Sequence, residues 1–281
     1  MQTLRRIVLA LVIVVLAPVV APAQTRDNNL AMGNPSGATT STTNSNNYLI
    51  SRSQYALSYN RSRGNPNWVS WHLSTAWLGS TDRSTTFTVD PVLTSLNWPR
   101  AYHDTYTNSG FDRGHMCPSA DRTGSDTDNK ATFICTNIVP QSSRNNSGPW
   151  ASLEAYCRTL AREGNELYII CGPWGSGGDS RGVFRYDWTG PSHGGGTITV
   201  KVPQWTWKVI VVLPNGSNDV SRVTTSTRTI AVRMPNSDSI ASNWRSYRVS
   251  IDTIESMTGY NFFSNVPASI QDVIEARVDN Q

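Results

Sequence analysis

Short runs of apolar, β-branched and aromatic residues recur along the chain, and Gly, Pro, Asn or Ser bounds each of them. Runs of this length between turn-forming residues predict β-strands. The strands expected on this basis span residues 68–73, 132–139, 167–171, 197–202, 207–213 and 229–234. The pattern therefore predicts a domain dominated by β-sheet.

Helical spacing of apolar residues is less frequent. A helix is expected from Pro149 to the residue before Gly164, because proline suits a first helical turn and glycine follows an end. A second helix is expected over residues 252–258, with Ser250 as its N-cap and Gly259 as its stop. Strands with a few helices packed on them indicate a mixed α+β domain. The buried stripe of the first helix is predicted to consist of Trp150, Leu153, Cys157, Leu160 and Ala161.

The first 23 residues have the features of a signal peptide. Arg5 and Arg6 precede an apolar run over residues 7–20, and a small-residue cleavage pattern ends at Ala23. The run is shorter than the ~20 apolar residues of a membrane span. We therefore expect a secreted or periplasmic protein with no membrane segment in its mature form. Removing this segment lowers the formal charge from +4 to +2, because it holds two arginines and no acidic residue.

The remaining chain divides by composition into two parts. Residues 24–46 are rich in Asn, Ser, Thr and Gly, which predicts a flexible leader that buries little apolar surface. Residues 47–281 show no linker, repeat or charge block and are expected to form one domain. Nearly all basic residues are arginines, which bind phosphate in a bidentate manner and favour an anionic partner.

Four cysteines lie in the part expected to be exported: Cys117, Cys135, Cys157 and Cys171. An oxidising compartment favours their pairing. Structural zinc is the alternative use of cysteine, but no two of them have the close Cys-x-x-Cys spacing of such a site. Two disulfides are therefore expected, and the sequence leaves all three pairings open.

The segment Asp112-Arg113-Gly114-His115 carries the first candidate chemistry. A histidine that titrates near neutral pH, beside ionic groups and a glycine, suits a general base that acts on a phosphate. An ordinary hydrogen-bonded histidine is the structural alternative. The other histidines, His72, His103 and His193, lack such neighbours and are expected to be structural or surface residues.

A second set of polar residues lies at the start of the first predicted helix and along it. The amide oxygen of Asn146 is a neutral ligand suited to Mg²⁺, which keeps most of its water and needs few protein contacts. Glu154 and Arg158 follow on the helix. The structural alternatives are a helix cap for Asn146 and an i,i+4 ion pair between Glu154 and Arg158.

These motifs, in this order and spacing, resemble the DNA/RNA non-specific endonucleases of the ββα-metal superfamily. The resemblance spans residues 33–275, and the opening Gly33-Asn34-Pro35-Ser36 is similar to the cyanobacterial extracellular branch. It implies a ββα-metal core in which helices pack on a central antiparallel sheet. The matching positions include residues 68–71, Arg83, 87–90, 112–115, 137–141, Asn146, Trp150, 153–154, Arg158, 202–203, 207–209, 254–255, 258–259 and 262–263.

The resemblance assigns roles to three residues at the reacting centre. It implies His115 as the general base, Asn146 as the direct metal ligand and Glu154 as the group that orients water on the metal. Mg²⁺ is the expected cofactor, with Mn²⁺ or another divalent cation as the alternative.

The resemblance also implies residues that bind the phosphate and support the site. Arg83 and Arg158 are expected to clamp the phosphate, and Arg113 is expected to hold the phosphate or the site architecture. Asn137 corresponds to an asparagine that supports the base, and Asp112 is expected to brace the motif.

The predicted function is that of a secreted, sugar-non-specific endonuclease. It would hydrolyse DNA and RNA to 5′-phosphate and 3′-hydroxyl ends, because water is the nucleophile and no 2′-hydroxyl is needed. It would select poorly among bases, because arginines that bind the shared phosphate carry no base information. An inhibitor protein is a further candidate partner. Two other functions stay open: a phosphodiesterase acting on another substrate, and a non-catalytic nucleic-acid-binding protein.

Overall fold

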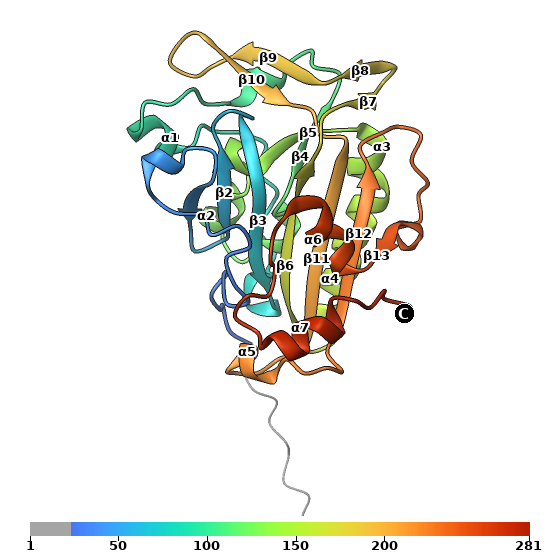
Figure 1. Cartoon of the computed structure of the whole chain (residues 1–281). Helices are drawn as coiled ribbons and strands as arrows, with labels where there is room; N and C mark the ends of the chain where they lie inside the picture. Colours follow the sequence, from blue (N-terminus) through green and yellow to red (C-terminus); the bar gives the residue numbers. More distant parts are fainter. Residues whose placement is uncertain (1–23) are drawn as a thin grey trace, which may run out of the picture.

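A seven-stranded sheet forms the centre of the molecule (Figure 1). The computed structural model describes residues 24–281, and the predicted signal peptide lies outside the described residues. Every neighbouring pair of strands in this sheet is antiparallel, which confirms the predicted α+β architecture. The strands follow the order β1 (Tyr48–Ser51), β2 (Ala56–Asn60), β3 (Asn65–Leu73), β6 (Asn165–Trp174), β11 (Trp205–Pro214), β12 (Arg228–Pro235) and β13 (Arg248–Val249).

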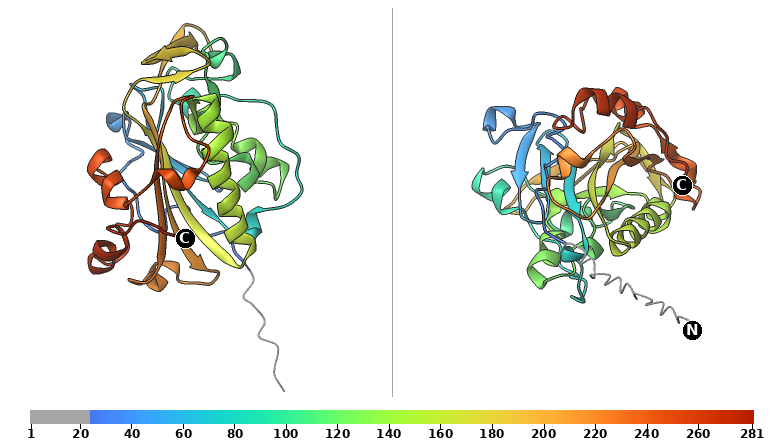
Figure 2. Two further views of the ribbon diagram at one scale, coloured as in Figure 1. Left: turned by 90° about the vertical axis from the view of Figure 1, so that its right-hand side faces the viewer. Right: turned by 90° about the horizontal axis from the view of Figure 1, so that it is seen from below.

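Both faces of the sheet are buried. In β6, Leu167 and Ile169 enter one hydrophobic core, and the alternating Tyr168 and Ile170 enter another. Successive side chains of a strand point to opposite faces, so a run that is apolar throughout must be covered on both sides. Figure 2 shows the C-terminal helices on one side of the sheet and a long helix on the other. The covering helices are α4 (Ala151–Arg162) on the first core, and α6 (Ile251–Thr258) and α7 (Ala268–Ile274) on the second.

The two helices with the clearest sequence signals form as expected. The stripe predicted for α4 is buried, from Trp150 to Ala161. In α6 the Ser250 hydroxyl accepts a hydrogen bond from the Thr253 amide at 3.2 Å, which satisfies a donor in the first turn. Gly259 ends α6 with φ of +74°, a conformation that glycine adopts without strain.

Two strands outside the main sheet precede α4 and position its N-terminus. β4 (Asp112–His115) pairs antiparallel with β5 (Ile138–Gln141), so that His115 lies opposite Ile138. Gly114 is required at this crossing, because a Cβ atom there would lie 2.1 Å from the side chain of Gln141. After β5 the chain continues through α3 (Ser143–Asn145) and a π-helical turn over Asn146–Trp150 into α4. The result is a ββα unit.

The remaining elements are short. Two hairpins at the top of Figure 1 extend beyond the sheet, and three small helices lie in its connections. None of the helices in residues 24–281 is both long and apolar enough to cross a membrane. The hairpins are β7 (Gly178–Ser180) with β8 (Val183–Arg185) and β9 (Asp187–Pro191) with β10 (Thr197–Lys201), and the helices are α1 (Pro91–Ser95), α2 (Asp126–Ala131) and α5 (Asp219–Arg222).

The expected strand over residues 132–139 is largely wrong. Residues Cys135–Asn137 form a 3₁₀ turn, and the strand begins only at Ile138. The side chain of Asn137 donates hydrogen bonds to the carbonyl oxygens of Cys117 and Thr132, both at 2.8 Å. These tertiary bonds hold the segment in a turn despite its β-type composition.

Residues 24–46 pack against the domain, in contrast to the flexible leader expected from their composition. Met32 and Ala38 are 2% and 4% exposed and belong to the second core. Asn29 donates hydrogen bonds to the carbonyl oxygens of Arg52 and Ser53. A few well-placed apolar and amide side chains are therefore sufficient to attach this polar segment to the sheet.

The four cysteines are free thiols in the structure, which corrects the expectation of two disulfides. All four are buried: Cys117, Cys157 and Cys171 pack in the first core and Cys135 in a third, smaller core. Burial raises the pKa of the Cys117 thiol to about 12. Here the cysteines behave as small hydrophobic residues, a use of cysteine that its sequence spacing does not reveal.

Candidate active site

A cavity of about 210 Å³ lies where β4 meets the start of α4. Of the seven predicted site residues, five line this cavity, and Asn137 and Arg158 do not. The surrounding wall includes Pro118, Ser119, Ala120 and Ala151. The five predicted residues that the fold brings together are Arg83, Arg113, His115, Asn146 and Glu154.

His115 is held as a neutral imidazole. Its ring lies 4.7 Å from the Phe133 ring and 5.4 Å from the Phe87 ring, measured between centroids, and the residue is 7% exposed. Burial, followed by the positive charge of Arg83, lowers the pKa of His115 to about 3. Its Nε2 atom has no hydrogen-bond partner among the described residues. At neutral pH the ring is therefore uncharged, and its Nε2 is not occupied by a protein hydrogen bond.

Asn137 binds the backbone that directly follows His115. Its amide group donates to the carbonyl oxygens of Thr132 and Cys117, and its Oδ1 accepts from the Cys117 amide at 2.9 Å. The Asn137 carbonyl also accepts from the amide of Met116, at 2.9 Å. Asn137 thus fixes the two residues that follow His115, Met116 and Cys117.

Asn146 lines the cavity at the start of the helical segment that leads into α4. Its Nδ2 donates to Asp112 Oδ2 at 3.0 Å, so the opposite atom of the amide, Oδ1, is available as a ligand. Asp112 Oδ1 in turn accepts from Arg181 Nη2 at 2.5 Å. Asp112 therefore links Arg181 to the Asn146 amide.

Glu154 lies on α4 beside a buried lysine. The Lys208 Nζ atom is 3.8 Å from Glu154 Oε1, and Lys208 is only 1% exposed. The same ammonium group lies 4.1 Å from the centroid of the Trp150 ring. Burial, opposed chiefly by the charge of Lys208, raises the pKa of Glu154 to about 7. A partly buried carboxyl group that faces the cavity and has a cation on one side is well placed to bind water or a second cation there.

Two arginines form the positively charged wall of the cavity. The Arg83 guanidinium lies over the Phe133 ring at 5.0 Å and donates to the Ser119 hydroxyl. Burial lowers the pKa of Arg83, and the charge of Glu154 opposes this effect. Arg113 lies over the Phe87 ring at 4.7 Å and donates to the carbonyl oxygen of His103 at 3.0 Å. Stacking on aromatic rings holds both guanidinium groups in fixed orientations.

Arg158 is engaged elsewhere. Its Nη1 atom is 2.9 Å from Asp121 Oδ1, and Asp121 is almost fully buried. The other oxygen of Asp121 accepts from the Trp71 indole at 3.0 Å. Arg158 therefore ties α4 to Asp121 rather than to the cavity, and the simple Glu154–Arg158 ion pair considered from the sequence is replaced by this longer-range one.

Three residues near the site were not predicted from the sequence. Asp121 and Arg181 are reached through side-chain contacts across the fold, which the sequence does not encode locally. Lys208 had a visible signal, since it is the one charged residue in the apolar run of residues 207–213. A lysine in a strand buried on both faces requires a nearby acid, and that acid is Glu154.

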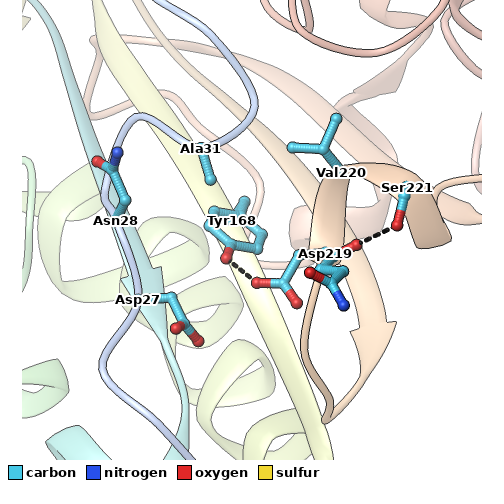
Figure 3. Close-up of a pocket in the computed structure, with 8 residues that line it drawn as sticks. Asp27, Asn28, Ala31, Tyr168, Asp219, Val220 and Ser221 are labelled. Carbon is cyan, nitrogen blue, oxygen red and sulfur yellow. Dashed lines mark hydrogen bonds between the residues drawn. The ribbon is translucent and has the colours of Figure 1, made fainter.

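A larger cavity of about 430 Å³ shares no lining residue with the active site (Figure 3). Its wall includes Asp27, Tyr168 and Asp219, and the Tyr168 hydroxyl donates to Asp219. It combines no base with a phosphate-binding cation, so it is a poor candidate for phosphodiester chemistry.

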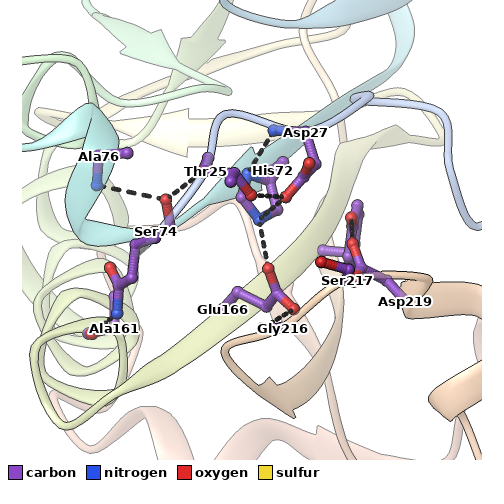
Figure 4. Close-up of polar contacts among 12 residues, drawn as sticks. Thr25, Asp27, His72, Ser74, Ala76, Ala161, Glu166, Gly216, Ser217 and Asp219 are labelled. Carbon is purple, nitrogen blue, oxygen red and sulfur yellow. Dashed lines mark hydrogen bonds and ion pairs between the residues drawn. The ribbon is translucent and has the colours of Figure 1, made fainter. Parts of the chain in front are cut away.

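His72 lies beside this cavity in a closed hydrogen-bond network (Figure 4). Its Nδ1 accepts from the Asp27 amide at 3.2 Å, which places a ring proton on Nε2, and Nε2 donates to Glu166 Oε2 at 3.2 Å. Neither ring nitrogen has a lone pair free for a metal. His72 therefore takes part in this network through both ring nitrogens.

An antiparallel pair of strands that carries a buried histidine, followed by a helical segment with an asparagine at its start and a glutamate about two turns later, defines a ββα-metal nuclease. Sequence comparison gives the same result: the DNA/RNA non-specific endonuclease family matches residues 32–269. The chain belongs to this family, and it is a nuclease.

Individual relatives agree with this assignment. A nuclease of Nostoc sp. strain PCC 7120 is 46% identical over 252 residues, which cover 90% of this chain and 86% of the relative. The mitochondrial nuclease EXOG of Xenopus laevis is 33% identical over 74% of this chain and 56% of its own length. A chain from the crystal structure of the EndoG/EndoGI complex, which addresses the mechanism of EndoG inhibition, superposes with a TM-score of 0.66 at 25% identity, covering 85% of this chain and 91% of that one.

Proposed function

We propose that the protein is a secreted, metal-dependent endonuclease that hydrolyses both DNA and RNA to 5′-phosphate and 3′-hydroxyl ends. The observation that carries this proposal is the cavity that joins a neutral, buried His115 to Asn146, Glu154 and two arginines. The polar side chains that line this cavity suit phosphate and water rather than the edges of bases, so we expect little selectivity for base sequence.

His115 acts as the general base in this proposal. It removes a proton from the water that attacks the phosphorus, and its lowered pKa keeps it neutral before the step. Arg83 and Arg113 balance the negative charge that grows on the phosphate oxygens. Since the nucleophile is water, the reaction does not require the 2′-hydroxyl of RNA, and both sugars are accepted.

The donor groups of the cavity fit a hard divalent cation. Asn146 Oδ1 and the Glu154 carboxylate are oxygen ligands, and the volume of about 210 Å³ leaves room for water around an ion. We propose that Asn146 holds Mg²⁺, or Mn²⁺ in its place, and that Glu154 orients water beside it. When bound, the cation would stabilise the charge of the phosphate and of the leaving 3′ oxygen.

Asn137 and Arg158 support the reaction indirectly. Asn137 fixes the backbone after His115, and Arg158 fixes α4, which carries Glu154. Of the arginines proposed from the sequence as a phosphate clamp, Arg83 retains this role, and Arg113 shares it in place of Arg158.

Export is proposed from the N-terminal sequence, with a secreted or periplasmic destination. DNA and RNA are the proposed partners. The likeness to a chain in the EndoG/EndoGI complex also supports an inhibitor protein as a partner of this nuclease.

A plasmid-degradation assay with added Mg²⁺, with and without a chelator, tests the proposal. The wild-type protein should convert supercoiled plasmid into fragments and should digest RNA, and the chelator should stop both reactions. His115→Ala should reduce turnover about 10²–10⁴-fold, the usual contribution of a positioned base, with nucleic-acid binding retained. Intact plasmid with bound protein would indicate a non-catalytic binder, and no effect on either polymer would indicate a phosphodiesterase for another substrate.

A further inference from the structure

Three carboxylates converge where α6 passes the end of α7, on the sheet face that α4 does not cover. Asp252 and Glu255 are one turn apart on α6, and Glu275 directly follows α7. One carboxylate oxygen from each residue lies within 4.8 Å of the others. This trio shares no residue with the nuclease cavity, and the proposed nuclease mechanism does not use it.

Glu275 is the unusual member of the trio. It is 5% exposed, and its Oε1 atom has no hydrogen-bond partner among the described residues. The charged groups that face it are all acids: Glu255, Asp252 and Asp272. A buried carboxylate surrounded by acids is costly unless a cation or a proton neutralises it.

The spacing of the three oxygens matches the reach of one calcium ion. Ca²⁺ binds oxygen ligands at ~2.3–2.6 Å, so two oxygens on the same ion lie at most ~4.6–5.2 Å apart. The three carboxylates already meet this limit. Asp252 and Glu255 face solvent in part, which leaves room for water to complete the coordination.

We propose that Asp252, Glu255 and Glu275 form a Ca²⁺ site that is separate from the catalytic cation. Ca²⁺ is favoured over Mg²⁺ because it accepts an irregular set of carboxylates, whereas Mg²⁺ requires a near-octahedral shell and retains its waters. The role of the site is structural, since it joins α6 to the end of α7. At this point the Asp252 amide also donates a hydrogen bond to the Glu275 carbonyl, at 3.2 Å.

The test is the chemical stability of the full mature protein at increasing concentrations of Ca²⁺ alone. A site with few protein ligands is expected to have a Kd of ~10⁻⁴–10⁻³ M. Above that concentration, the folding equilibrium constant should rise about tenfold for each tenfold increase in free Ca²⁺. Glu275→Gln should abolish this response and should not destabilise the Ca²⁺-free protein, because it removes a buried charge next to other acids. Asp252→Asn, a change at the exposed ligand, should weaken the response.

Two controls separate this site from other effects of calcium. Asn146→Ala, in the nuclease cavity, should retain the full response. Asp272→Asn removes a neighbouring exposed charge without removing a ligand, and it should also retain the response. The proposal is wrong if Ca²⁺ does not stabilise the wild type, which would mean that a proton neutralises Glu275. An equal response in Glu275→Gln, or its loss in Asn146→Ala, would also overturn it.

Discussion

The replacement of Asn137 by alanine tests how the fold positions the catalytic base. The change removes the three side-chain hydrogen bonds that join Asn137 to the backbone of Cys117 and Thr132. All three residues are buried, so the freed backbone groups lose their partners without gaining water. At roughly 1 kcal/mol or slightly more per bond, the free energy of unfolding should fall by about 3–5 kcal/mol.

The same change should impair catalysis beyond its effect on stability. Cys117 lies two residues after His115, and a displacement of the base by about 1 Å can cost 10²-fold in rate. We expect kcat to fall by about that factor, with KM little changed, when the reaction is measured well below the unfolding transition. Denaturant titration gives the loss of stability, and initial rates on a defined oligonucleotide give the loss of kcat.

Asn29→Ala is the matched control. Asn29 is also buried and also makes three hydrogen bonds to backbone groups, those of Arg52, Ser53 and His72, away from the nuclease cavity. Its replacement should reduce stability by a similar amount and leave kcat near the wild-type value. If the two variants lose kcat equally, or if Asn137→Ala retains full kcat, the positioning role of Asn137 is refuted.

Three further predictions concern the metal, the base and the thiols. Asn146→Ala should raise the Mg²⁺ concentration needed for half-maximal activity, and a titration that overlays the wild type would contradict the ligand assignment. Because burial and Arg83 lower the pKa of His115 to about 3, NMR should find its ring neutral through the usual histidine range near 6.5, with Arg83→Ala raising the pKa. The stability linked to this shift is present above pH ~6.5 and is lost as the pH falls toward 3. Thiol titration of the unreduced protein should find four free thiols after denaturation, and fewer would indicate disulfides.

The sequence predicted the elements whose signals are local. The apolar run around Ile169 and the helical stripe around Leu153 report burial directly, and β6 and α4 form where expected. The segment before Ile138 has similar composition but bends, because the bonds of Asn137 reach residues that are distant in sequence. The burial of Met32 likewise depends on residues that are distant in sequence, such as Phe262, which belongs to the same core.

The sequence predicted those residues of the site whose side-chain type and motif indicate a chemical role. His115, Asn146 and Glu154 share one cavity, as their motifs implied. The partner of Arg158 could not be predicted, since Asp121 belongs to a separate segment that only the folded chain brings to α4. The thiols were misjudged because pairing depends on which cysteines the fold brings into disulfide geometry, and the spacing of cysteines does not report this.

The proposed mechanism is tested most directly by the chemical identity of the cleavage ends. DNA and RNA oligonucleotides of matched sequence are digested by the wild-type protein with Mg²⁺, and the products are identified by mass spectrometry. Attack by water activated at His115 predicts internal cleavage of both polymers, with 5′-phosphate and 3′-hydroxyl ends. Cyclic 2′,3′-phosphate ends, or cleavage of RNA while DNA stays intact, would show that the substrate's own 2′-hydroxyl is the nucleophile and would contradict the mechanism.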